Sequence, residues 1–180
     1  MANTNAPSGF KPIRHLSGGE IRYNEYTIAS GYNTSIFYGE PVNLTGTGKN
    51  IAVSSAGTAT IGCFYGVSYT DATGKEKFSR YWPANTVATN IKANVADDPN
   101  IIYHVQCGTL ADTNVGSQCN HVVGAGNTST GTSGGYLDGS YATTGKYFRV
   151  LGIYPDVSND YGAYAKAEVT IIKHELRGGS

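Results

Sequence analysis

The stretch TATIGCFYGVSYT, residues 58–70, decides the fold class of this chain. Apolar or aromatic side chains recur there at every second residue, namely at Ile61, Cys63, Tyr65, Val67 and Tyr69. A period of two is typical of a β-strand with one packed face. The closing stretch AYAKAEVTIIKHEL, residues 163–176, alternates in the same way, which disfavours a helix there. Both stretches therefore predict β-strands.

Working outward, further strands are expected over residues 21–29, 35–44, 87–95, 101–107 and 147–154. Asp71 to Gly74 have turn chemistry, and the DDPN sequence at residues 97–100 predicts a hairpin between the strands that flank it. Residues 108–146 are rich in small polar residues and are expected to form a long loop region held by brief strands. The chain has 24 glycines, 14 tyrosines and only 14% charged residues, which disfavours long helices. We predict an all-β fold, a sandwich or barrel of roughly eight to ten short strands.

The amino-terminal stretch MANTNAPSGFKPIRHLSGG has no apolar periodicity, and it contains prolines and glycines. We therefore expect residues 1–20 to leave the domain as an extended arm that can reach a neighbouring subunit. Residues 21–180 are expected to form a single β domain, since 180 residues are enough for one sizeable core. The low content of charged residues also suggests that part of the surface is covered by oligomerisation.

Composition argues against several classes of partner. Thirteen basic residues balance thirteen acidic ones, so no large electrostatic field would attract nucleic acid or an anionic membrane. No apolar run approaches the length of about 20 residues that spans a bilayer, and no secretory signal begins the chain, so we expect synthesis in the cytoplasm. The three cysteines cannot all pair within one chain, and we expect reduced thiols, with Cys119 the most exposed of them.

Motifs for catalysis or for cofactors are weak. GTSGG at residues 131–135 resembles the nucleophile loop of trypsin-like serine proteases, but Thr132 replaces the expected aspartate and nothing places a histidine beside Ser133. GTGKN at residues 46–50 and GAGNTSTG at residues 124–131 both miss positions of the nucleotide-binding fingerprints. The acidic residues near 97–100 and 156–160 are explained by turns as well as by a cation. We expect no catalytic residues, no metal and no cofactor.

Several segments together resemble the capsid decoration, or cement, proteins of tailed bacteriophages. The matching segments are MAN followed by GFKPIRH, then FYGEPV, ADDPNIIYHVQ, GAGNTSTG with Leu137-Asp138, FRVLGI and the closing GAYAKAEVTIIKHELR. The resemblance covers most of the chain except residues 45–59 and 108–122. It implies a non-enzymatic β domain on the outside of an icosahedral shell, commonly a homotrimer, that bridges and stabilises subunits of the major capsid protein. The expected location is then the exterior of the virion.

On this hypothesis the arm supplies the contacts with the capsid. Phe10, Ile13 and Leu16 would insert between capsid subunits, and Lys11 and Arg14 would pair with acidic groups. The whole capsid-binding segment is expected to be Phe10, Lys11, Pro12, Ile13, Arg14, His15 and Leu16. Tyr81 and Trp82 are candidate interface aromatics, although a core position is also open for Trp82.

Two other functions stay open. A carbohydrate-binding or adhesin-like β domain of a virion would use the many tyrosines and Trp82 as stacking platforms. A hydrolase would use Ser133 as its nucleophile.

Overall fold

The computed structural model describes residues 3–177, which form fifteen β-strands and two short 3-10 helices, with no α-helix in that range. Every pair of named strands in this range is antiparallel, and the sheets pack in a sandwich-like arrangement, so the predicted all-β fold is confirmed. The total of fifteen exceeds the expected eight to ten, and only eight strands have four or more residues: β1, β3, β5, β6, β7, β8, β13 and β15. The other seven have only two or three residues.

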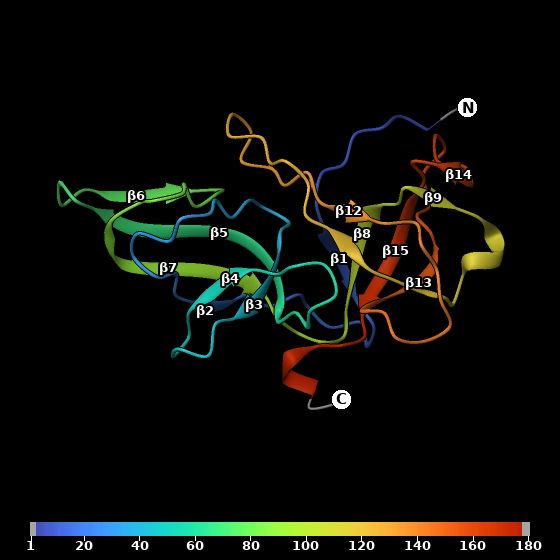
Figure 1. Ribbon diagram of the computed structural model, residues 1–180, viewed down its shortest axis with the longest axis horizontal. Coiled ribbons are helices and arrows are strands. Elements are labelled where there is room, and N and C mark those ends of the chain that lie inside the picture. Colours follow the sequence, from blue (N-terminus) through green and yellow to red (C-terminus); the bar gives the residue numbers. More distant parts are fainter. Residues whose placement is uncertain (1–2, 178–180) are drawn as a thin grey trace.

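Two main sheets lie side by side (Figure 1). The first has the order β1 (Lys11–His15), β8 (Ile101–Gln106), β15 (Lys166–Ile171), β13 (Phe148–Ile153) and β10 (Gln118–Cys119). The second has the order β2 (Asn24–Tyr26), β7 (Ala88–Ala96), β5 (Gly62–Asp71), β3 (Pro41–Leu44) and β4 (Ile51–Val53), and β6 (Glu76–Ser79) pairs with β5.

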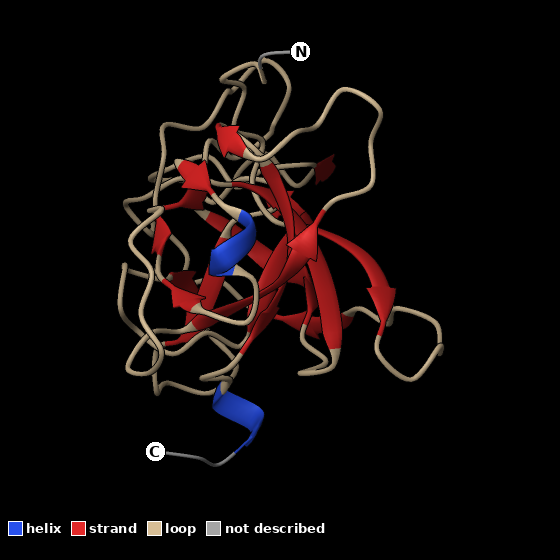
Figure 2. Cartoon of the chain, turned by 90° about the vertical axis from the view of Figure 1, so that its right-hand side faces the viewer, coloured by secondary structure: helices blue, strands red, loops and turns tan. Residues whose placement is uncertain are grey.

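Short elements complete the fold (Figure 2). The strand β9 (Thr109–Leu110) pairs with β14 (Gly162–Ala163), and β11 (His121–Val122) pairs with β12 (Tyr136–Leu137). The 3-10 helices are η1 (Asp112–Asn114) and η2 (Glu175–Arg177). Residues 108–146 thus form the predicted loop region with brief strands.

Each main sheet has its own apolar cluster, and the alternation in the sequence explains much of it. In and next to β15, Ala165, Ala167, Val169 and Ile171 are all buried in the first cluster, as predicted. The second cluster is built around Phe64, Val95 and Trp82, and Trp82 is fully buried. The core position for Trp82 is therefore correct, and its alternative role as an interface aromatic is wrong.

The alternation predicted for β5 breaks at one residue. Cys63 and Phe64 are both buried, whereas the next side chain, Tyr65, is 41% exposed. The register between β5 and β7 shifts between Phe64 and Gly66, which leaves Tyr65 as the extra residue of a β-bulge. The extra residue of a bulge interrupts the alternation of side chains between the two faces of the strand. Tyr65 therefore lies on the surface instead of in the core.

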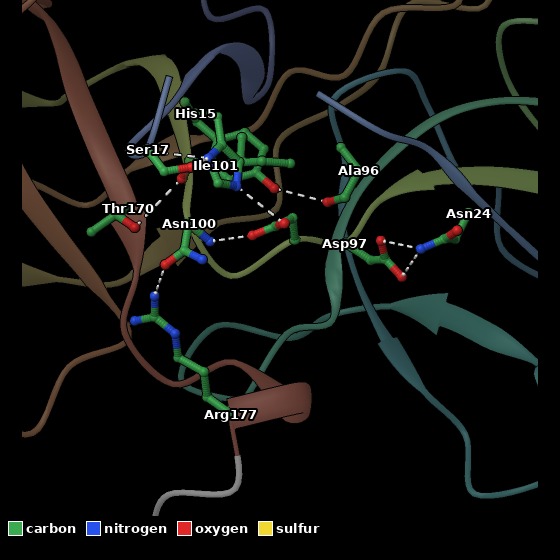
Figure 3. A network of polar contacts seen from close by, with 11 residues as sticks. His15, Ser17, Asn24, Ala96, Asp97, Asn100, Ile101, Thr170 and Arg177 are labelled. Carbon is green, nitrogen blue, oxygen red and sulfur yellow. Dashed lines mark hydrogen bonds and ion pairs between the residues drawn. The ribbon is translucent and has the colours of Figure 1, made fainter. Parts of the chain in front are cut away.

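The predicted hairpin around residues 97–100 is wrong, because β7 and β8 belong to different sheets. The connection is a crossover held by side chains on both sides (Figure 3). Asp97 accepts hydrogen bonds from the Tyr26 hydroxyl at 2.6 Å and from the Asn24 amide at 2.8 Å. On the other side, His15 lies 3.1 Å from the Asp98 carboxylate. The turn residues determine the local change of direction, but the two separate cores determine which strands pair.

The expected arm is also wrong for the described residues, and Met1 and Ala2 lie outside them. β1 pairs with β8 in the first sheet, with Lys11 opposite His104. Phe10 is fully buried, 4.9 Å from the ring of Phe148 between centroids. The side-chain amide of Asn3 donates to the carbonyl of Ala163 at 3.0 Å. A sequence without periodicity is compatible with an edge strand as well as with a free tether, since an edge strand needs only one partner.

The three cysteines are free and buried, including Cys119, which was expected to be the most exposed. Burial raises the pKa of all three thiols, which keeps them protonated and unreactive. We expect a thiol reagent such as 5,5′-dithiobis(2-nitrobenzoate) to label no cysteine of the native chain at pH 8, and all three after unfolding in guanidinium. Rapid labelling of Cys119 without denaturant would contradict its burial.

Candidate partner-binding surface

Three tyrosines from separate parts of the second sheet gather on one surface. Tyr23 precedes β2, Tyr38 precedes β3, and Tyr65 is the bulged residue of β5. The rings of Tyr23 and Tyr65 lie 4.2 Å apart between centroids, and those of Tyr38 and Tyr65 lie 5.0 Å apart. Tyr23 and Tyr65 are 37% and 41% exposed. We call Tyr23, Tyr38 and Tyr65 the tyrosine patch.

Arg80 adds a positive charge to this patch. Its guanidinium carbon lies 4.5 Å from the centre of the Tyr38 ring, which is a cation–π geometry. The side chain is exposed, and among residues 3–177 no carboxylate forms an ion pair with it. A guanidinium held over an aromatic ring and not neutralised within the chain is ready to bind a carboxylate of a partner.

A surface hollow of about 360 Å³ adjoins the patch, because Arg80, whose guanidinium lies over Tyr38, also lines the hollow. It lies over β5, β6 and β7, and its other lining residues are Gly66, Val67, Ser68, Phe78, Ser79 and Asn94. Phe78 on β6 is 79% exposed, so an accessible aromatic ring lines the hollow. The patch and the hollow together form one aromatic surface with a single unpaired cation.

The hydroxyls of Tyr23 and Tyr38 are neutral at physiological pH, because their pKa values are raised. Burial, together with the neighbouring Tyr65 and Tyr38, raises the pKa of Tyr23 to about 12. Burial and Tyr65 also raise the pKa of Tyr38, and the charge of Arg80 opposes part of this effect. Neutral hydroxyls can donate hydrogen bonds to a partner, and the rings offer apolar contact area.

The segment predicted to bind the capsid is placed differently from the prediction. Lys11, Pro12 and Ile13 are half-buried in β1, and Leu16 is 53% exposed. Arg14 already pairs with Glu168 of β15. Residues 13–15 do line a shallow hollow of about 590 Å³ with residues 18–21, but they do so as part of the folded sheet. Residues 11–15 therefore form an edge strand of the first sheet.

The predicted interface aromatics also differ from each other. Tyr81 is half-buried, and its ring stacks on that of Phe37 at 5.3 Å between centroids. Trp82 cannot serve as a stacking platform for a sugar because it is fully buried. Sequence reasoning missed the tyrosine patch. Its members are far apart in the chain, and the bulge that exposes Tyr65 left no signal in the alternating pattern.

Ser133 does not have the surroundings of a catalytic nucleophile. It is 1% exposed, and its Oγ accepts a hydrogen bond from the Gly135 amide at 2.9 Å. No histidine in the described part of the chain forms a hydrogen bond with it. The ionisable group near its hydroxyl is the buried carboxyl of Glu40. Ser133 is thus buried and has no histidine partner in the described residues, which is not the arrangement of an activated nucleophile.

The other candidate ligand motifs are occupied by internal contacts. Asp156 accepts hydrogen bonds from the backbone and the hydroxyl of Ser158, which makes the segment a polar turn. In residues 46–50, the Asn50 amide donates to the Thr47 carbonyl in a turn. Within residues 3–177 there is no group of three or more His, Cys, Asp or Glu side chains that could hold a metal ion. Over the same residues no helix is both long enough and apolar enough to cross a bilayer.

No family model, no curated protein and no solved structure matches this chain.

Proposed function

We propose that this protein is a capsid decoration protein that binds the outside of an assembled phage head through the tyrosine patch, Arg80 and the adjoining hollow. The observation that carries the proposal is the exposed aromatic surface with its unpaired guanidinium. Tyrosine and arginine are the residue types that most often dominate the binding energy of protein interfaces. The resemblance of the segments GFKPIRH, FYGEPV and GAYAKAEVTIIKHELR to cement proteins supports the choice of the major capsid protein as the partner.

The residues of this surface indicate which side chains the partner should present to it. Phe78 and the rings of Tyr23 and Tyr65 would cover apolar side chains of a capsid subunit, and Arg80 would receive a carboxylate. The proposed assembly is a homotrimer, so three modest contacts with the shell would act together and raise the apparent affinity. Because the decoration protein binds only the assembled lattice, binding would stabilise that lattice by mass action. No catalytic step is involved.

Deleting residues 1–19 would not test this function, because it would remove β1 and the buried Phe10. Surface substitutions provide the test. The binding partner in this test is the empty, expanded head of the phage that encodes the protein. We expect Arg80→Ala and Tyr65→Ala each to raise the dissociation constant for these heads by at least about tenfold, the effect of a hot-spot residue. Occupancy is measured by co-sedimentation with heads that lack the protein, over a series of concentrations.

Tyr164→Gly is the matched control, since Tyr164 is 39% exposed but lies beside β14, on the side of the molecule away from β6 (Figure 1). Its occupancy should equal that of the unmodified chain. If the double variant with Arg80→Ala and Tyr65→Ala binds as well as the unmodified chain, the tyrosine patch is not the capsid contact. If the unmodified chain does not bind heads at all, the decoration function itself is wrong. A monomeric mass in light scattering would contradict the homotrimer.

A further inference from the structure

A second hollow is lined by the amino-terminal segment together with residues of β8, of β12 and next to β14. In Figure 1 the amino-terminal segment passes near β12 and β14. Its volume is about 360 Å³, within the range of small-molecule sites. Besides Gly108, its lining residues are Asn5, Pro7, Gln106, Tyr136, Asp138 and Tyr164. We call it the amide pocket, because the side-chain amides of Gln106 and Asn5 both line it.

The two amides are held in fixed orientations. Gln106 at the end of β8 is only 6% exposed. Its Nε2 donates to Asn5 Oδ1 at 2.9 Å, and its Oε1 accepts from the Ala6 amide at 2.8 Å. Asn3 ties the same segment to the residues before β14 by donating to the Asp160 carbonyl at 2.7 Å. The amino-terminal segment is therefore a preorganised wall of the pocket, and preorganised polar groups lose little entropy when a ligand binds.

Several hydrogen-bonding groups in the wall have unused capacity. Among residues 3–177, Gln106 Nε2 makes a single hydrogen bond, although it has two hydrogens to donate. The side-chain nitrogen of Asn5 and the hydroxyls of Tyr136 and Tyr164 have no partner within the same residues. These donors and acceptors are grouped around one hollow, so they can bind a ligand with several hydroxyl groups.

Tyr164 brings an aromatic ring to the pocket at a cost in backbone energy. Its φ is +59°, a left-handed conformation that is uncommon for a residue with a bulky side chain. The conformation is fixed by the Tyr164 amide, which donates to the Gly108 carbonyl at 3.0 Å. Strained residues of this kind gather at binding sites, where the surrounding structure holds them. A tyrosine ring held at the edge of a polar hollow offers a flat apolar face to a ligand.

The charge of the lining narrows the class of ligand. The only carboxylate is Asp138, whose Oδ1 accepts from the Ser140 amide and whose Oδ2 lies 3.7 Å from Lys146 Nζ. No lysine or arginine lines the pocket, so it has no group for the charge of a phosphate or a carboxylate. An apolar ligand would leave the second hydrogen of Gln106 Nε2 and the side-chain nitrogen of Asn5 without partners, which is unfavourable.

We propose that the amide pocket binds one neutral sugar residue, with its hydroxyls on Gln106, Asn5 and Tyr136 and its apolar ring face on Tyr164. The residue can come from a free sugar or from the end of a polysaccharide chain, and both present the same chemistry. This activity is separate from capsid binding, because the amide pocket and the tyrosine patch share no residue.

The test is an NMR titration of the ¹⁵N-labelled chain with glucose, galactose, mannose and N-acetylglucosamine, and with a linear oligosaccharide of each. At least one sugar should shift the amide resonances of Gly108, Tyr136 and Tyr164 in a saturable way. Equal affinity of the monosaccharide and its oligosaccharide would assign the site to a single terminal or free residue. Tighter binding of the oligosaccharide by more than about tenfold would show that the site recognises more than one sugar residue, which would overturn the proposal of a single-residue site.

Two variants and a control make the test specific. Tyr164→Gly removes the ring at a position where glycine relieves the strained φ, and we expect the dissociation constant to rise at least fivefold. Tyr136→Phe removes only a hydroxyl and should raise the dissociation constant for the sugar about threefold. Tyr65→Ala should weaken capsid binding and leave sugar binding unchanged. Tyr164→Gly should weaken sugar binding and leave capsid binding unchanged. If no sugar shifts these resonances, or if glucose 6-phosphate binds more tightly than glucose, the proposal is overturned.

Discussion

Phe10→Ala is expected to lower the free energy of unfolding by about 3–5 kcal/mol, the usual cost of emptying a buried aromatic site. The ring is fully buried, 4.9 Å from Phe148 and 6.3 Å from His121 between centroids, so alanine would leave a cavity that the sheet cannot close. The backbone there is equally confined. Gly9 has φ +74°, and a Cβ on it would lie 2.8 Å from the Gly39 carbonyl oxygen.

Leu16→Ala is the matched control for this prediction, because Leu16 is 53% exposed and belongs to the same predicted arm. It should change the unfolding free energy by less than about 0.5 kcal/mol. Urea unfolding followed by far-UV circular dichroism measures both variants, and Phe10→Leu, with an expected cost of about 1–2 kcal/mol, serves if the alanine variant does not fold. An extended arm would leave all three variants as stable as the unmodified chain, and that result would contradict the burial of Phe10.

Glu40→Gln is expected to stabilise the protein at alkaline pH. Glu40 is 2% exposed, and its Oε1 has no hydrogen-bond partner. Burial raises the pKa of this carboxyl from 4.5 to about 7, and the Ser133 hydroxyl opposes part of the effect. The folded chain therefore binds a proton that the unfolded chain has already released between pH 4.5 and 7. Stability from this group falls as the pH rises through that window, and the cost persists above it.

The size of the effect follows from the pKa shift of Glu40 and is about 3 kcal/mol at pH 8. Glutamine keeps the shape without the charge, so the variant should match the unmodified chain near pH 4 and exceed its stability at pH 8 by that amount. His104 and His174, whose pKa values burial lowers to about 4, give stability the opposite dependence on pH in both proteins. The difference between the two unfolding curves therefore isolates Glu40. A difference that does not change with pH would show that Glu40 is not buried as a charged group.

Local patterns in the sequence predicted the local structure well. The alternation of residues 163–176 became β15 with its small apolar side chains buried, and Asp71 to Gly74 became the turn between β5 and β6. These features depend on neighbours in the chain, since side chains alternate across a strand whatever the rest of the fold does. The fully buried position of Trp82 agrees with one of the two roles considered for it.

Features that depend on distant residues could not be predicted. The DDPN turn was read correctly as a change of direction, but it joins two sheets instead of two paired strands. The bulge at Tyr65 arises from its pairing with β7, so the alternation in β5 alone could not reveal it. The tyrosine patch and the amide pocket could not be predicted for the same reason, since both bring together residues that are far apart in the chain. Tyr23 and Tyr65 meet across 42 positions of the chain, and Asn5 meets Gln106 across 101.

The sequence by itself determined that this chain is built from strands, where many of them lie and which side chains are buried where the alternation is unbroken, because a period of two follows from the geometry of the extended backbone. Only the tertiary structure decided that the amino-terminal residues complete the first sheet, that Tyr65 faces the solvent, and that the tyrosine patch and the amide pocket exist. The physical reason is that strand pairing and core packing are long-range choices. Backbone groups accept any partner with suitable geometry, and only the fit of side chains in the two cores selects among them.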